Sequence, residues 1–135
     1  MILLPNLLRA NAEAATRDTG FDPVPVVKFF NPTGAATWLA SELHADGDTL
    51  FGLADLGFGC PELGNFSLGE FAGVRLPFGL GIERDLSFAT PYRLSTWVAC
   101  ARRAGSILWA ETLLRRAASQ PDDDQLPDLS SEGEG

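Results

Sequence analysis

Four side chains able to transfer protons or bind a metal ion lie close together in the sequence. They are Glu42, His44, Asp46 and Asp48, and His44 is the only histidine of the chain. Their spacing matches neither a calcium-binding EF-hand loop nor a zinc site of the His-x-x-x-His type. Because polar residues at a turn are normally solvated, we expect a surface turn here and no metal site.

A second pair of carboxylates, Glu83 and Asp85, flanks Arg84. Alternate residues of an extended segment share a face, so the two carboxylates would lie side by side, as acid–base catalysis requires. Structural ion pairs use the same residue types. We therefore expect surface pairing of Glu83 and Asp85 with arginines from the C-terminal part of the chain, in preference to catalysis.

The stretch GLADLGFGCPELGNFSLGEF, residues 52–71, contains five glycines. Glycines let backbone N–H groups approach a phosphate, but a P-loop also needs Gly-Lys followed by Ser or Thr. The single lysine of the chain is Lys28, and the acids Asp55 and Glu62 would repel an anion. We therefore expect no nucleotide site, and we expect residues 57–64 to form a turn.

Cys60 lies in this stretch and would act as a nucleophile only beside a basic group or a helix N-terminus. Its neighbours are acidic, and His44 would have to reach it across the sheet. We expect an inert, packed thiol. Cys100 follows forty residues later without a Cys-x-x-Cys pattern, so both cysteines are expected to be free thiols in a reducing cytoplasm.

A short helix is predicted at the end of the glycine-rich stretch. Ser67 and Glu70 have the spacing of a capping box, in which the side chain of each bonds the backbone N–H of the other. Phe66 and Phe71 occupy the two positions of a hydrophobic staple. The helix is expected to begin at Ser67 and to end at Gly73.

The strands are predicted from β-branched and aromatic runs bounded by turn residues. Residues 26–30 form one such run. The dipeptide Asp46-Gly47 predicts a tight turn between strands near 36–44 and 49–55. We also expect a short strand around 85–88.

The remaining elements are expected to be helices. Residues 3–16 form a first helix, and from about residue 90 apolar side chains recur at spacings of three and four. Gly105-Ser106 is expected to end this helix and to start another. The fold class is therefore α+β: residues 1–119 form a single domain in which an antiparallel sheet carries a short capped helix and C-terminal helices. Residues 120–135 are expected to be a disordered acidic tail.

The net charge of −8 is unevenly distributed. Residues 29–74 hold six acids and no lysine or arginine, whereas residues 75–119 hold seven arginines and three acids. Such a chain can present two surfaces of opposite charge, which favours charged partners or docking of the acidic tail. No segment is long and apolar enough for a membrane helix.

Several segments together resemble a known family. They are PVVKFFNP, ATWLASEL, DTLFGLADLGFGCPELGNFSLGEF and LPFGLGIERDLSF, in this order. The chain is similar over about residues 3–110 to the small bacterial proteins grouped as domain of unknown function 2958. The resemblance implies a single domain often encoded near plasmid and mobile-element genes, and it supplies no established catalytic residues.

We expect a small cytoplasmic binding protein without enzymatic activity, cofactor or metal, acting on a protein partner through a charged surface. An accessory or anti-defence role on a mobile element is one form of this function. An enzyme with a cleft formed by Glu62, Glu83, Asp85 or His44, and a nucleic-acid binder using C-terminal arginines, stay open, as does a dimer. The candidate partner-binding residues are Glu62, Glu70, Glu83, Arg84, Asp85, Arg102, Arg103, Arg115 and Arg116.

Overall fold

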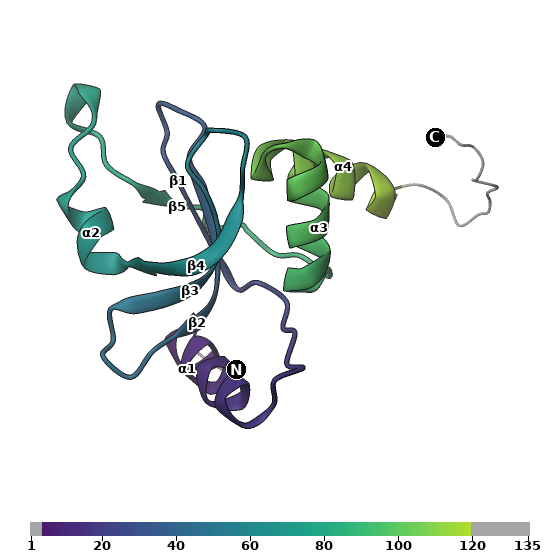
Figure 1. Ribbon diagram of the computed structural model, residues 1–135. Helices are drawn as coiled ribbons and strands as arrows, with labels where there is room; N and C mark the ends of the chain where they lie inside the picture. Colours follow the sequence, from purple (N-terminus) through teal and green to yellow (C-terminus); the bar gives the residue numbers. More distant parts are fainter. Residues whose placement is uncertain (1–3, 120–135) are drawn as a thin grey trace, which may run out of the picture.

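A computed structural model describes residues 4–119 of the chain (Figure 1). The predicted tail, residues 120–135, lies outside the described residues. The helices are α1 (Leu4–Arg17), α2 (Leu68–Gly73), α3 (Leu94–Ala104) and α4 (Ile107–Ser119), with a short 3-10 turn η1 (Pro77–Gly79). The strands are β1 (Val27–Phe30), β2 (Thr37–Leu43), β3 (Thr49–Asp55), β4 (Glu62–Ser67) and β5 (Glu83–Arg84).

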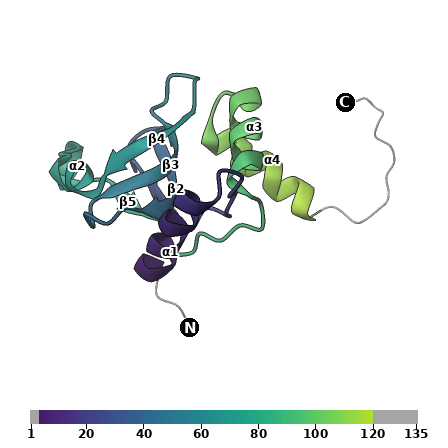
Figure 2. The same ribbon diagram turned by 60° about the horizontal axis from the view of Figure 1, so that its bottom comes forward.

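The strands form one antiparallel sheet in the order β4-β3-β2-β1-β5. The helices pack on it, so the predicted α+β fold is confirmed. Figure 1 shows α3 and α4 on one side of the sheet and α2 on the opposite side, and Figure 2 brings α1 forward. No helix within residues 4–119 has the length and apolar character needed to cross a bilayer.

Two hydrophobic clusters form the core, one on each face of the sheet. The first is built from Leu39 and Leu53 of the sheet together with the buried side chains of α3 and α4. The second contains Leu8 of α1 and Trp38 of β2, and Phe71 of α2 packs against it. Each helix therefore covers the sheet with the apolar stripe that its sequence periodicity predicts.

Two predictions about strands are wrong. Residues 62–64, expected in a turn, belong to β4, which pairs with β3 from Thr49↔Ser67 to Ala54↔Glu62. The short strand expected at 85–88 is β5, Glu83–Arg84, which pairs with the end of β1. It stops there because the carboxylate of Asp85 accepts hydrogen bonds from the backbone and hydroxyl of Ser87, which turns the chain away.

A β-bulge at Ser41 interrupts the pairing of β2 with β3. Ala40 lies opposite Gly52 and Glu42 lies opposite Phe51, so Ser41 is the extra residue. Its carbonyl accepts a hydrogen bond from Asn11 of α1 at 2.9 Å. Because side chains alternate along a strand, the extra residue turns Glu42 to the face occupied by α3 and leaves Leu43 in the opposite core.

Three aspartates cap the starts of three helices from distant positions in the sequence. Asp22 accepts the N–H of Ser95 in α3 at 3.0 Å, and Asp48 accepts the N–H of Gly69 in α2 at 2.8 Å. Asp55, which is fully buried, accepts the N–H of Ile107, the first residue of α4, at 2.9 Å. These bonds satisfy donors that a helix start leaves free, and they tie each helix to the rest of the fold.

The start of α2 differs in part from the predicted capping box. Ser67 is the N-cap and its hydroxyl oxygen accepts the N–H of Glu70, as the spacing predicts. The hydroxyl itself donates to Asp48 at 2.6 Å, so Asp48, rather than the exposed Glu70, completes the cap. The rings of Phe66 and Phe71 lie 5.8 Å apart, the contact expected of the staple.

Replacing Asp55 with Ala is expected to lower the free energy of unfolding by about 2–3 kcal/mol, because the buried N–H of Ile107 loses its acceptor. Urea unfolding followed by circular dichroism measures the loss. Asp22→Ala is the matched control: it removes the same kind of cap at an exposed site and should cost about 1 kcal/mol. Equal losses in the two variants would contradict this account of Asp55.

Candidate functional site

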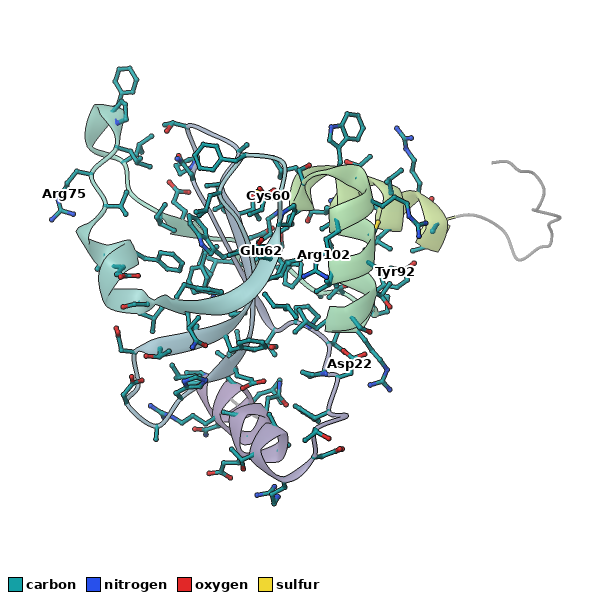
Figure 3. All side chains as sticks on the ribbon, in the orientation of Figure 1. Asp22, Cys60, Glu62, Arg75, Tyr92 and Arg102 are labelled. Atoms are coloured by element: carbon teal, nitrogen blue, oxygen red, sulfur yellow. The ribbon has the colours of Figure 1, made fainter. Side chains whose placement is uncertain are left out.

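A groove of about 690 Å³ lies between the sheet and α3. Phe51, Leu63 and Asn65 line it from β3 and β4, and Val98 lines it from α3. The loop that follows α1 closes one end, where Asp22 caps α3 (Figure 3). An apolar groove with a few polar groups is the usual form of a binding site.

Glu42 and His44 contribute the ionisable groups of this groove. The bulge at Ser41 places both on its floor, and Oε1 of Glu42 lies 4.0 Å from Nε2 of His44. Burial raises the pKa of the Glu42 carboxyl, and the nearby His44 opposes that rise in part. The Glu42 side chain is 13% exposed and the His44 side chain 38% exposed, so the imidazole is the more accessible group.

A second hollow, of about 620 Å³, meets the first at these residues. It lies against α1, and it shares Ala15, Glu42 and His44 with the groove. The two hollows together could hold an extended ligand whose middle passes over the Glu42–His44 pair. We call this surface the Glu42 groove. A carboxylate held largely out of water can bind a cationic group or exchange a proton with a ligand.

Asp46 and Asp48, expected beside these residues at the hairpin tip, do not join the groove. Asp46 accepts hydrogen bonds from the backbone of Asp48 and from both the backbone and hydroxyl of Thr49. Asp48 caps α2. Gly47 has a φ of 72°, the left-handed conformation that the turn requires. Within residues 4–119 no three His, Cys, Asp or Glu side chains are grouped closely enough to hold a metal ion.

The hydrogen bonds from Thr49 lower the pKa of Asp46 from 3.8 to about 2. Because the pKa is lower in the folded than in the unfolded protein, the stabilising contribution of Asp46 is present above pH 3.8 and is lost as the pH falls towards 2. A carboxyl titration followed by NMR should give this value. Thr49→Val removes the hydroxyl donor and should raise the pKa of Asp46; an unchanged value would contradict the assignment.

Glu62, Glu83 and Asp85 do not converge with His44 in one cleft. Glu62 begins β4 and Glu83 belongs to β5, and these strands are the two edges of the sheet. The expectation that Glu83 and Asp85 pair with C-terminal arginines is wrong. Asp85 lies 3.8 Å from Lys28, and neither Glu83 nor Arg84 takes part in an ion pair within residues 4–119.

A buried ion pair that the sequence analysis missed joins β1 to α4. The ammonium of Lys28 donates to both carboxylate oxygens of Glu111, at 2.8 and 3.0 Å, and the carboxylate of Asp85 completes its surroundings. The Lys28 side chain is 10% exposed. Hydrogen bonds to Ser87, more than the charge of Lys28, lower the pKa of Asp85. The sequence around Lys28 carried no signal for this partner, which lies 83 residues away.

The four candidate arginines are exposed but do not form one cluster. Arg102 and Arg103 lie in the last turn of α3, next to the start of α4, whereas Arg115 and Arg116 lie near the end of α4. Arg115 lies about eight residues, or about 12 Å, along α4 from the start of that helix, next to which Arg102 and Arg103 lie. Arg115 also lies 3.6 Å from Glu111 of its own helix.

Cys60 is exposed, so the prediction of a packed thiol is wrong. The carboxylate of Asp55 bonds the N–H of Gly57 at 2.8 Å, and Gly57 and Gly59 have φ values of 93° and 87°. These constraints hold the loop before β4 in a turn, on which Cys60 is exposed. Both cysteines are free, as predicted.

The fold and the groove define a small α+β protein with a hollow between its sheet and its third helix. The chain belongs to the family described as protein of unknown function DUF2958, whose family model matches residues 3–108. The predicted resemblance is therefore confirmed. Comparison with curated proteins and with solved structures finds no match.

Proposed function

We propose that this protein is a binding protein that holds a basic segment of a protein partner in the Glu42 groove. The proposal rests on the position of the Glu42 carboxylate, which is largely buried where the two hollows meet. Within residues 4–119, His44 is the only residue that forms an ion pair with Glu42. A lysine or arginine of the partner would neutralise this charge, and a desolvated charge pair is the kind of contact that anchors an interface.

The charge of the surrounding chain supports a basic partner. Residues 29–74, which include β2, β3 and β4, contain six acids and no lysine or arginine. The hollow against α1 adds Glu13 and Arg9, whose charges offset each other, so the excess of acids attracts a cationic segment before it makes contact. The attraction is screened by salt, so binding should weaken as the ionic strength rises.

A cytoplasmic location and an accessory or anti-defence role on a mobile element belong to the same proposal. The two free thiols are consistent with a reducing compartment. The role rests on the family resemblance, because accessory proteins of mobile elements usually act by binding. This argument comes from the family and not from any residue of this chain.

Affinity capture from bacterial lysate with the purified chain tests the groove. Wild-type protein is compared with Glu42→Gln, which keeps the shape of the side chain and removes its charge, and with Glu83→Gln on the far edge of the sheet. We expect a stoichiometric partner that is retained by Glu83→Gln and lost by Glu42→Gln. Retention by both variants would overturn the role of the groove.

A second candidate function is an enzyme in which Glu42 donates a proton. The observation that favours it is the raised pKa of Glu42, since ionisable groups with perturbed pKa values in a cleft are often catalytic. His44, the accessible member of the pair, would accept a proton from water or substrate. Model esters, phosphoesters and glycosides should then turn over with wild-type protein and not with Glu42→Gln or His44→Asn. Equal rates would contradict it.

A further inference from the structure

β4 is an open edge of the sheet. It is six residues long and pairs on one side with β3, whereas β5, the other edge, is two residues long. In Figure 1 the broad arrow of β4 leads directly into α2. An edge strand of this length presents backbone groups to which another extended chain can bind.

The hydrogen-bonding pattern identifies the unpaired groups. The N–H of Leu68 donates to the carbonyl of Asp48, next to β3. Because backbone groups alternate in direction along a strand, the N–H and C=O groups of every second residue before Leu68 also point towards β3. The N–H and C=O groups of Leu63 and Asn65 therefore point outward. Neither residue has another backbone partner within residues 4–119. Both side chains are exposed, and both line the Glu42 groove.

The features that usually protect an edge strand are missing from β4. Its sequence, Glu-Leu-Gly-Asn-Phe-Ser, has no lysine, no proline and no bulge. Its first residue is the exposed Glu62, and the exposed Glu70 lies just beyond its last residue. The strand spans about 17 Å between its ends. Each end of the open edge thus carries one carboxylate without an ion-pair partner in the described residues.

We propose that β4 binds an extended segment of the partner protein as a sixth strand, and that this segment carries a lysine or arginine near each end. The backbone of Leu63 and Asn65 supplies the hydrogen bonds, and Glu62 and Glu70 select the charges. This inference rests on the proposed binding function and specifies the form of the partner. A strand at this edge lies at the rim of the Glu42 groove, because Leu63 and Asn65 belong to both.

A second copy of the chain fits this edge less well than a basic partner. Antiparallel pairing of two β4 strands would bring Glu62 of one copy towards Glu70 of the other at both ends. Glu70 belongs to α2 and not to the strand, so the two carboxylates would approach each other at the ends of the paired strands, where like charges repel. The charge pattern therefore favours an occupant with cations at both ends.

A displayed library of random ten-residue peptides, selected on the full-length chain, supplies the probe. We expect selected peptides to share alternating β-branched residues with lysine or arginine at both ends. A synthetic peptide is then N-methylated at alternate residues in either of two phases. The phase that blocks the amides facing β4 should weaken binding at least tenfold, and the other phase should not. Recovery of no peptide, or equal effects of both phases, would overturn the proposal.

Asn65→Pro and Asn65→Ala test the same edge from the protein side. Both variants lose the side-chain amide of Asn65, and only the proline variant also loses the backbone N–H. This N–H does not face β3, so the difference between the two variants reports on its role in binding. Circular dichroism and urea unfolding establish that both are folded. The proline variant should bind the selected peptide at least tenfold more weakly than the alanine variant. Equal affinities would overturn the proposal.

Glu42→Gln separates this inference from the proposed function. If Glu42→Gln loses the peptide and Asn65→Pro keeps it, the groove binds and the edge does not, so the edge inference fails. If Asn65→Pro loses the peptide and Glu42→Gln keeps it, the edge inference stands and the groove proposal fails. If sedimentation shows a dimer that Asn65→Pro abolishes, the occupant of the edge is a second copy of the chain. This result would overturn the proposal of a basic partner.

Discussion

Replacing Gly52 with Ala is expected to lower the free energy of unfolding by at least about 3 kcal/mol. A Cβ atom at this position would overlap the carbonyl oxygen of Leu39 and would lie 2.9 Å from its carbonyl carbon. These are backbone atoms, held by the bulge at Ser41 and by the pairing of β2 with β3, so they cannot rotate away. The clash can be relieved only by separating the two strands.

Gly64→Ala is the matched control for this prediction. Gly64 lies directly opposite Gly52 in the β3–β4 pairing, and a Cβ atom there would meet no atom within 4 Å. The free energy of unfolding of the Gly64→Ala variant should differ from that of the wild type by less than about 1 kcal/mol, since alanine also lowers the entropy of the unfolded chain. Urea unfolding of both variants measures the difference. Similar losses would show that the close contact at Gly52 is not the cause.

Replacing Lys28 with Met should lower the free energy of unfolding by about 3–5 kcal/mol. Lys28 and Glu111 are both largely buried, and the ammonium contacts both oxygens of the carboxylate. Without the lysine, Glu111 keeps a charge that water reaches poorly, next to Asp85. Arg115, which is 70% exposed, can replace little of the lost interaction.

The double variant Lys28→Met with Glu111→Leu tests whether the loss comes from the unpaired charge. Apolar side chains of similar volume remove the charge as well as its partner, so the double variant should be more stable than Lys28→Met alone. Arg115→Met serves as the exposed control and should cost less than about 1 kcal/mol. A double variant as unstable as the single one would assign the loss to packing.

The parts of the fold with strong local signals were predictable from the sequence. Asp46-Gly47 marks the hairpin because its turn needs a positive φ, and Gly105-Ser106 marks the break between α3 and α4 for the same reason. Gly105 has a φ of 86°, and the hydroxyl of Ser106 accepts the N–H of Trp109. In each case the residues that decide the structure lie within a few positions of one another.

β4 was missed because its residues have little intrinsic preference for a strand. Glycine, asparagine and glutamate are depleted in strands, and the run Glu-Leu-Gly-Asn is typical of a turn. The strand forms because β3 offers a free side along most of its length, from Thr49 to Ala54. Tertiary pairing thus outweighs local propensity here, and the position of the open edge could not be read from the sequence.

The groove was not predicted from the sequence, which indicated a solvated turn at Glu42 and His44. His44 and Glu42 were recognised as chemically capable, but they were grouped with Asp46 and Asp48, their neighbours in the sequence. The groove depends on one extra residue in β2 and on α3, which lies about fifty residues further along the chain. Lys28 was missed for the same reason, since its partner Glu111 belongs to the last helix.

The three aspartate caps have a consequence for the order in which the chain can fold during synthesis. Asp22 precedes Ser95 by 73 residues, Asp48 precedes Gly69 by 21, and Asp55 precedes Ile107 by 52. In every case the acceptor leaves the ribosome before the helix that needs it. A short helix is marginal alone in water, so α3 and α4 can become stable as they emerge beside strands and loops already in place. In folding from the N-terminus towards the C-terminus, the aspartate caps of α2, α3 and α4 are therefore already present when each of these three helices forms.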